Sequence, residues 1–131
     1  MRIFTIACVM LVPAHVVAGE CWEASNFTGQ SAESDRAYQF DSDRFADGMK
    51  ICFTAEGGVV TGNDLELVRM GASTLIGWAA HPEGLETVNV YQIDRARQKL
   101  LFTQSRIGTA TVTDLLPDYA AVFVADVAPV D

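Results

Sequence analysis

The chain has 131 residues, half of them hydrophobic, and its 17 acidic residues against 9 basic ones give a formal net charge of −8. This length fits one domain and makes two improbable. The apolar content excludes a disordered chain, and the negative charge argues against nucleic acid as a partner because phosphate binding needs a cationic surface. Composition therefore indicates a single acidic globular domain.

The first 18 residues have the pattern of an export signal. Arg2 precedes an apolar run that one threonine interrupts, and Val16 and Ala18 fit the −3 and −1 positions of a signal-peptidase site. The alternative is an uncleaved membrane anchor, which needs about 20 apolar residues, and the acidic Glu20 arrives too early for one. We therefore predict a cleaved signal peptide.

Cleavage after Ala18 leaves residues 19–131 as a single periplasmic or secreted domain with no stable membrane insertion. Cys8 departs with the leader, so two cysteines remain, Cys21 and Cys52. In an exported domain such a pair predicts one disulfide. The competing interpretation is a metal or redox pair, but the spacing is not C-x-x-C and no second pair completes a zinc site.

The patterning of the mature chain predicts an all-β fold, because period-two alternation is punctuated by turn residues every eight to twelve positions. The first strand is expected over 22–28 and ends at Gly29, followed by a polar loop over 30–36. Tyr38 and Phe40 then share one face of a strand. The next residues, 41–43, are expected in a turn region.

The middle of the chain is expected to contain strands that share this alternation, separated by Gly-, Asp- or Pro-containing turns. They are expected over 49–54, 59–61, 65–70, 74–80, 87–93 and 99–104. The strand over 65–70 is expected to be buried on both faces. The clearest hairpin joins 87–93 to 99–104, and Asp94 at its turn is placed to accept backbone N–H bonds. A further β-like run over 107–112 contains Gly108, which suggests a bulge.

The C-terminal segment over 119–127 fits two structures. Val122, Phe123 and Val124 favour a strand, whereas Pro117 near a first turn allows an amphipathic helix. We favour the strand. The whole then has about eight to ten strands, arranged as a small antiparallel up-and-down barrel or a sandwich with one disulfide.

Catalytic residues are scarce in the mature sequence. His81 is its only histidine, lies in a predicted turn before Pro82, and is accompanied by no G-x-S-x-G motif. One histidine and two paired cysteines cannot supply a zinc site, and no cofactor is indicated. Paired carboxylates remain possible, so a carboxylate-based hydrolase ranks below a binding protein without catalytic activity.

Three aspartates resemble a crude calcium loop: Asp41, Asp43 and Asp47. The EF-hand pattern requires an oxygen ligand and then glycine at the positions that Phe45 and Ala46 occupy here. A solvated turn is therefore the favoured interpretation, and calcium is a weak alternative.

Basic residues concentrate around the predicted hairpin, at Arg95, Arg97, Lys99 and Arg106. This cluster could form a patch for an anionic ligand, a lipid headgroup or an acidic protein. The alternative, which we favour, is a row of charges that guards an edge strand against aggregation. Trp78 is a further candidate for contact with a ligand or partner.

The segment Gly77-Trp78, Pro82 and Gly84-Leu85 resembles a stretch of the bacterial periplasmic inhibitors of secreted metalloproteases. The resemblance covers residues 77–85 and implies a small eight-stranded barrel with one disulfide and an inhibitory role. We therefore predict an exported β-barrel that binds a protein partner or a small apolar or anionic ligand, with inhibition of a secreted enzyme as the alternative. Loops near 30–36, 41–48 and 94–98 are expected to present the contacts.

Overall fold

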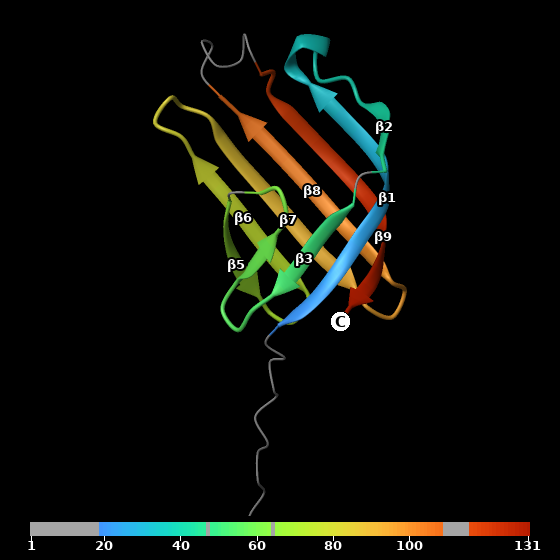
Figure 1. Cartoon of the computed structure of the whole chain (residues 1–131). Helices are drawn as coiled ribbons and strands as arrows, with labels where there is room; N and C mark the ends of the chain where they lie inside the picture. The colour runs from blue at the N-terminus through green and yellow to red at the C-terminus, as the bar shows by residue number, and fades with distance from the viewer. Residues whose placement is uncertain (1–18, 47, 64, 109–115) are drawn as a thin grey trace, which may run out of the picture.

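The computed structural model describes residues 19–46, 48–63, 65–108 and 116–131. These residues form one antiparallel sheet that curls into a nearly closed barrel (Figure 1). The strands are β1 (Glu20–Glu33), β2 (Asp41–Phe45), β3 (Met49–Phe53), β4 (Gly58–Val60), β5 (Glu66–Met70), β6 (Thr74–Ala80), β7 (Glu86–Asp94), β8 (Lys99–Ile107) and β9 (Tyr119–Val130). The predicted all-β fold is confirmed, and the predicted leader lies outside the described residues.

The strand order is β4-β3-β1-β9-β8-β7-β6-β5, with β2 paired to the second half of β1. Consecutive strands from β5 to β9 form a meander, and β9 pairs with β1, so the connections are up-and-down. Closure comes from a bridge between Gly57 and Val68 and from the Arg69 N–H, which donates to the Glu56 carbonyl at 3.2 Å.

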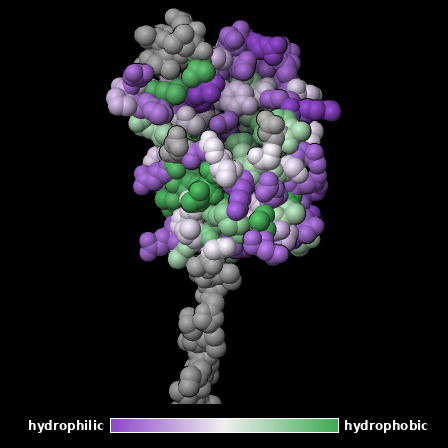
Figure 2. All heavy atoms as spheres, in the orientation of Figure 1, coloured by the Kyte–Doolittle hydropathy of each residue, from purple (hydrophilic) through white to green (hydrophobic). Residues whose placement is uncertain are grey.

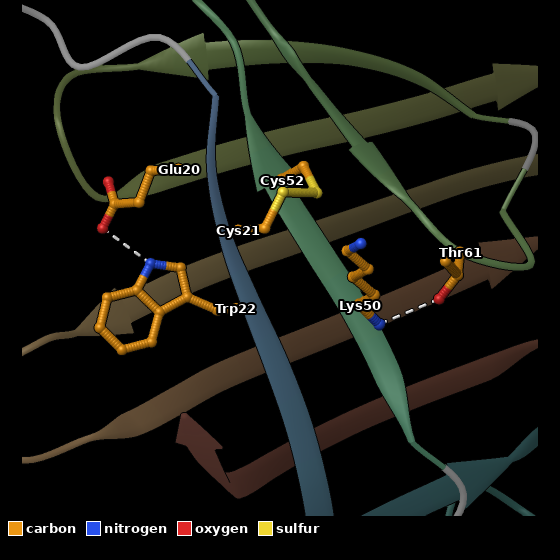
Figure 3. Close-up of a disulfide and its surroundings, with 6 residues drawn as sticks. All are labelled: Glu20, Cys21, Trp22, Lys50, Cys52 and Thr61. Atoms are coloured by element: carbon orange, nitrogen blue, oxygen red, sulfur yellow. Dashed lines mark hydrogen bonds between the residues drawn. A yellow bond between two sulfur atoms is a disulfide. The ribbon is translucent and has the colours of Figure 1, made fainter. Parts of the chain in front are cut away.

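The disulfide between Cys21 and Cys52 joins directly opposed residues of β1 and β3 (Figure 3), as predicted. We call this end of the barrel the disulfide end. Beside it, the Trp22 indole N–H donates to Glu20 Oε1 at 2.7 Å. The opposite end carries the 3-10 turn η1 (Ser34–Arg36), and we call it the η1 end.

The prediction that Gly29 ends the first strand is wrong, because β1 continues to Glu33 and includes half of the expected loop. At Gly29 the backbone of β9 approaches β1 closely. A Cβ atom at this position would lie 1.9 Å from the Val122 carbonyl oxygen. The glycine thus permits close strand contact, which is one meaning of glycine inside a strand.

The prediction of a turn at Asp41–Asp43 is also wrong. These residues belong to β2, where Asp43 is the register partner of Gly29. Tyr38 and Phe40, expected on a strand face, precede β2 and are exposed, with Tyr38 at a φ of 55°. An edge strand rich in charged residues is a common protection against pairing with other chains.

Other expectations are confirmed. Strand β6 has the predicted bounds, and the β7–β8 hairpin forms with the Arg97 N–H donating to Asp94 Oδ1 at 3.0 Å. In β9 every second residue from Ala121 to Val127 is buried, the period of a strand rather than a helix. In β5, however, Val68 and Met70 are exposed, so this strand is not buried on both faces. The run after Gly108 lies outside the described residues.

Candidate functional site

The side chains inside the barrel differ in kind between its two ends. Toward the disulfide end, its inward-facing side chains are aliphatic or aromatic, with Phe53, Leu75 and Leu100 fully buried. At mid-height the sheet register brings Tyr91, Phe102 and Phe123 side by side on three neighbouring strands. Their rings stack, with centroids 5.0 Å apart for Tyr91 and Phe102 and 6.1 Å apart for Phe102 and Phe123. These rings form an aromatic floor.

One level further toward the η1 end, the register partners are Asn89, Gln104 and Ala121. The space next to the aromatic floor, beside Asn89 and Gln104, is not filled by side chains. A cavity of about 240 Å³ results, and we call it the inner cavity. Its lining, taken over the described residues, has no charged side chain: the aromatic floor, Phe45, Tyr119 and the amides Asn63, Asn89 and Gln104 supply most of it.

Asn89 is the buried polar group of this cavity and is only 4% exposed. Its amide nitrogen donates to the Tyr91 hydroxyl at 2.9 Å, and the Asn63 amide nitrogen donates to the same hydroxyl at 2.5 Å. Among the residues that the structure describes, nothing donates a hydrogen bond to Asn89 Oδ1. An unsatisfied buried acceptor costs about 1–3 kcal/mol, so a bound N–H or O–H group would be stabilised there.

Tyr91 keeps its proton in this environment. Burial raises the pKa of its hydroxyl, and the hydrogen bonds from Asn89 and Asn63 offset only part of that effect. The inner cavity therefore combines aromatic faces with neutral polar groups. Such a combination is typical of small-molecule sites, which are mostly apolar with a few placed hydrogen-bonding groups.

A second, polar hollow of about 200 Å³ lies on the η1 side. Three carboxylates and one guanidinium line it together with neutral polar side chains: Glu33, Asp41, Asp43, Arg36, Ser31, Gln39 and Ser42. Tyr119 lies between the two spaces, since it lines the inner cavity and its hydroxyl hydrogen-bonds the Ser31 side chain. Burial and the negative charges of Asp43 and Glu33 raise the pKa of Tyr119. In Figure 2, hydrophilic residues gather at the upper end of the molecule, where β2 and η1 lie.

The four basic residues singled out in the sequence do not form one free patch. Arg97 pairs with Asp94 at 3.0 Å, and Lys99 pairs with Asp126. Arg106 lies toward the η1 end, where its guanidinium donates to the Pro117 carbonyl at 3.0 Å and sits 5.4 Å from the Tyr119 ring centroid.

Arg95, the fourth, has a structural environment at the disulfide end. Its guanidinium makes two hydrogen bonds to the Glu20 carboxylate, at 2.7 and 2.8 Å, and a third to the Ser73 hydroxyl at 2.7 Å. It also lies 5.6 Å from the Phe53 ring centroid, beside the core. These contacts link the β7–β8 turn to the start of β1 and to the residue before β6.

We expect the Glu20–Arg95 pair to make stability pH-dependent. The hydrogen bond from Arg95 is the main cause that holds the pKa of Glu20 below its ordinary value of 4.5, against the opposing effect of burial. Because the folded state lowers this pKa, the pair stabilises the fold above pH 4.5 and the stabilisation disappears as pH falls through the folded-state pKa.

Urea unfolding of the wild type and Glu20→Gln over a range of pH checks this expectation. At neutral pH the variant should lose about 1 kcal/mol, a figure that allows for solvent screening, and the difference should vanish in acid. Arg95→Gln removes the other partner and should lose the same pH dependence. A difference between wild type and Glu20→Gln that is constant across pH would contradict the expectation.

Two of the three calcium candidates lie on the same face of β2, where they line the polar hollow. Asp41 and Asp43 lie on β2, Asp41 pairs with Arg36 at 3.1 Å, and Asp47 lies outside the described residues. Within the described part of the chain, no group of three histidine, cysteine or acidic residues is arranged to hold a metal ion.

Trp78 lies on the outside of the barrel and is 41% exposed. With Val88 and Ile107 it lines an outer groove of about 450 Å³. This groove continues into a surface of apolar side chains on four neighbouring strands, which we call the outer apolar surface. Its members are Ile76, Trp78, Val88, Val90, Leu101, Val122 and Val124.

Sequence reasoning missed Asn89, Gln104 and Tyr91. A signal for Asn89 existed, because it lies on the same face of a predicted strand as Tyr91 and Ile93, two positions apart each time. A polar residue on the buried face of a strand is uncommon unless it is hydrogen-bonded.

Comparison with protein-family models, curated proteins and solved structures finds no significant match. In the described part of the chain no helix is both long and apolar enough to span a membrane. The function is therefore argued from the geometry of the site.

Proposed function

We propose that this chain is an exported, non-enzymatic binding protein that holds a small ligand in the inner cavity. The observation that carries the proposal is the nearly fully buried Asn89, which belongs to the lining of a cavity with an aromatic floor and whose Oδ1 has no donor among the described residues. A ligand with a ring and one N–H or O–H group would cover the floor and satisfy this acceptor.

Export is part of the proposal, and the disulfide supports it. Disulfides persist in oxidising environments such as the periplasm or the extracellular space and are rare in the cytosol. The predicted leader over residues 1–18 is the second support. An anionic ligand at the β7–β8 turn has less support, because Arg95, Arg97 and Lys99 are each paired with a carboxylate.

The size of the inner cavity limits the ligand. Pockets for drug-sized ligands occupy about 300–1,000 Å³, whereas this cavity has about 240 Å³. The ligand is therefore a compact molecule, or a longer molecule of which only one end enters the cavity.

Benzyl alcohol is a suitable neutral probe, because it has one aromatic ring and one hydroxyl donor. We expect its addition to shift the NMR signals of Asn89 and Phe102 and to saturate. Asn89→Leu keeps the volume but removes the acceptor, so it should weaken binding roughly 2- to 12-fold, the equivalent of one hydrogen bond of about 0.5–1.5 kcal/mol.

The matched control is Gln92→Leu, which makes the same kind of substitution on the outer face of the same strand. This variant should bind the probe as the wild type does. Absence of binding, or binding that moves signals only on the outside of the barrel, would overturn the proposal.

A second candidate is binding of a secreted enzyme, the role that the resemblance around Trp78 implies. The outer apolar surface favours it, because contiguous exposed apolar residues mark many protein interfaces. Trp78→Ala separates the two candidates: it should abolish inhibition of a secreted metalloprotease if the outer groove binds the enzyme, and it should leave probe binding in the inner cavity unchanged.

A further inference from the structure

The inner cavity and the polar hollow on its η1 side, which we call the acidic hollow from here on, offer two kinds of contact to one ligand. The first offers ring faces and an unpartnered acceptor, and the second offers carboxylates. Resting on the proposed function, we infer that the ligand is an organic ammonium cation, with its hydrocarbon or aromatic body on the aromatic floor and its charged nitrogen toward Asn89 and the acidic hollow.

The sheet register places the carboxylates next to the cavity. Asp43 is the register partner of Gly29, and Gly29 is in turn the partner of Phe123. Because Gly29 has no side chain, this position of β1 places no side chain between Asp43 and Phe123. Glu33 is the register partner of Tyr119, which lines the cavity. The negative charges of both carboxylates act on Tyr119.

The charges near this site favour a cation over an anion. Arg36 also lines the hollow, but its guanidinium pairs with Asp41 at 3.1 Å, so two of the three carboxylates keep their charge uncompensated. Arg106 is held by the Pro117 carbonyl and lies over one face of Tyr119. Within the described residues, Asp43 and Glu33 take part in no ion pair, so both can act on a ligand.

The unpartnered hydrogen-bond acceptor of the cavity also favours a cation over an anion. Asn89 Oδ1 can only accept a hydrogen bond, which an ammonium N–H donates and a carboxylate cannot. Ring faces attract cations through their quadrupole, and the barrel already uses three such contacts, with Arg69 5.2 Å from the Phe53 ring centroid as the shortest. The net charge of −8 adds a long-range attraction for cations.

Three probes with one ring test the inference: benzylamine, which is a cation at neutral pH, benzyl alcohol, which is neutral, and benzoate, which is an anion. We expect benzylamine to bind about tenfold more tightly than benzyl alcohol, as charge-assisted bonds and cation–π contacts together contribute more than a neutral bond. Benzoate should not bind measurably, and added salt should weaken benzylamine most.

Asp43→Asn removes one charge with little change of shape. It should weaken benzylamine roughly 3- to 10-fold and leave benzyl alcohol within a factor of two. The control is Glu66→Gln, which makes the same change of charge on the exposed face of β5 and should change neither affinity.

The outcomes separate the inference from the function on which it rests. If benzyl alcohol binds at Asn89 as tightly as benzylamine, the inference of a cationic ligand is wrong and the proposed binding function stands. If none of the probes binds in the cavity, both are overturned. If Asp43→Asn and Glu66→Gln affect benzylamine equally, attraction by the acidic hollow is wrong.

Discussion

Phe123→Ala should destabilise the fold by about 3–5 kcal/mol, the usual cost of truncating a buried phenylalanine. Phe123 is 2% exposed and lies where the aromatic rings of the core meet. Its ring stacks on Phe102 and makes edge contacts with Phe27 and Phe45, at centroid distances of 6.5 and 5.1 Å. Removing it takes one ring contact from each of these three phenylalanines and extends the inner cavity into the core.

The free energy of unfolding, measured by urea denaturation, checks this expectation. Phe40→Ala is the matched control, because Phe40 is 56% exposed and should change stability by less than about 0.5 kcal/mol. Equal losses for the two variants would contradict the packing described for Phe123. The enlarged cavity should also change the affinity for benzyl alcohol, since the probe loses part of its floor.

Much of the fold could be predicted because local signals agreed with the global structure. Alternation located β3, β6, β7 and β8, and the two cysteines left after the leader predicted the disulfide. The errors came from residues whose local signal has two meanings. Gly29 reads as a strand end, but in the barrel it permits β9 to approach. The acidic stretch Asp41–Asp43 reads as a turn, but it forms an edge strand on β1.

The candidate site was harder to predict because it depends on register between strands. Period-two alternation places Asn89 on the buried face of its strand, but it does not say which residues of β8 and β9 share its level. That level is fixed by pairing: Asn89 opposes Gln104, and Gln104 opposes Ala121. The register is therefore needed before the residues that line the cavity together, such as Asn89 and Gln104, can be identified.

The basic residues illustrate the same limit for electrostatics. Arg95, Arg97 and Lys99 are close in sequence, which suggests a cationic patch, but each is paired with a carboxylate, and the partners of Arg95 and Lys99 are distant along the chain. Glu20 and Asp126 come from the two terminal strands of the barrel. The interior carboxylates of β2 are brought to the cavity by equally distant pairings. Charge clustering along a sequence therefore does not report the sign of the potential at the site.

Removal of the disulfide in the double variant Cys21→Ser, Cys52→Ser should lower the free energy of unfolding by about 3–4 kcal/mol, because a cross-link across 31 residues restricts the unfolded chain. The bond ties β1 to β3, and the residues between β3 and β4 make the bridge and the hydrogen bond to β5 that close the barrel. Urea denaturation of the variant and of the oxidised and reduced wild type measures the effect, and the reduced wild type should match the variant. A loss below about 1 kcal/mol would mean that strand pairing alone holds this end of the barrel, and that the constraint described by the chain-entropy argument is absent.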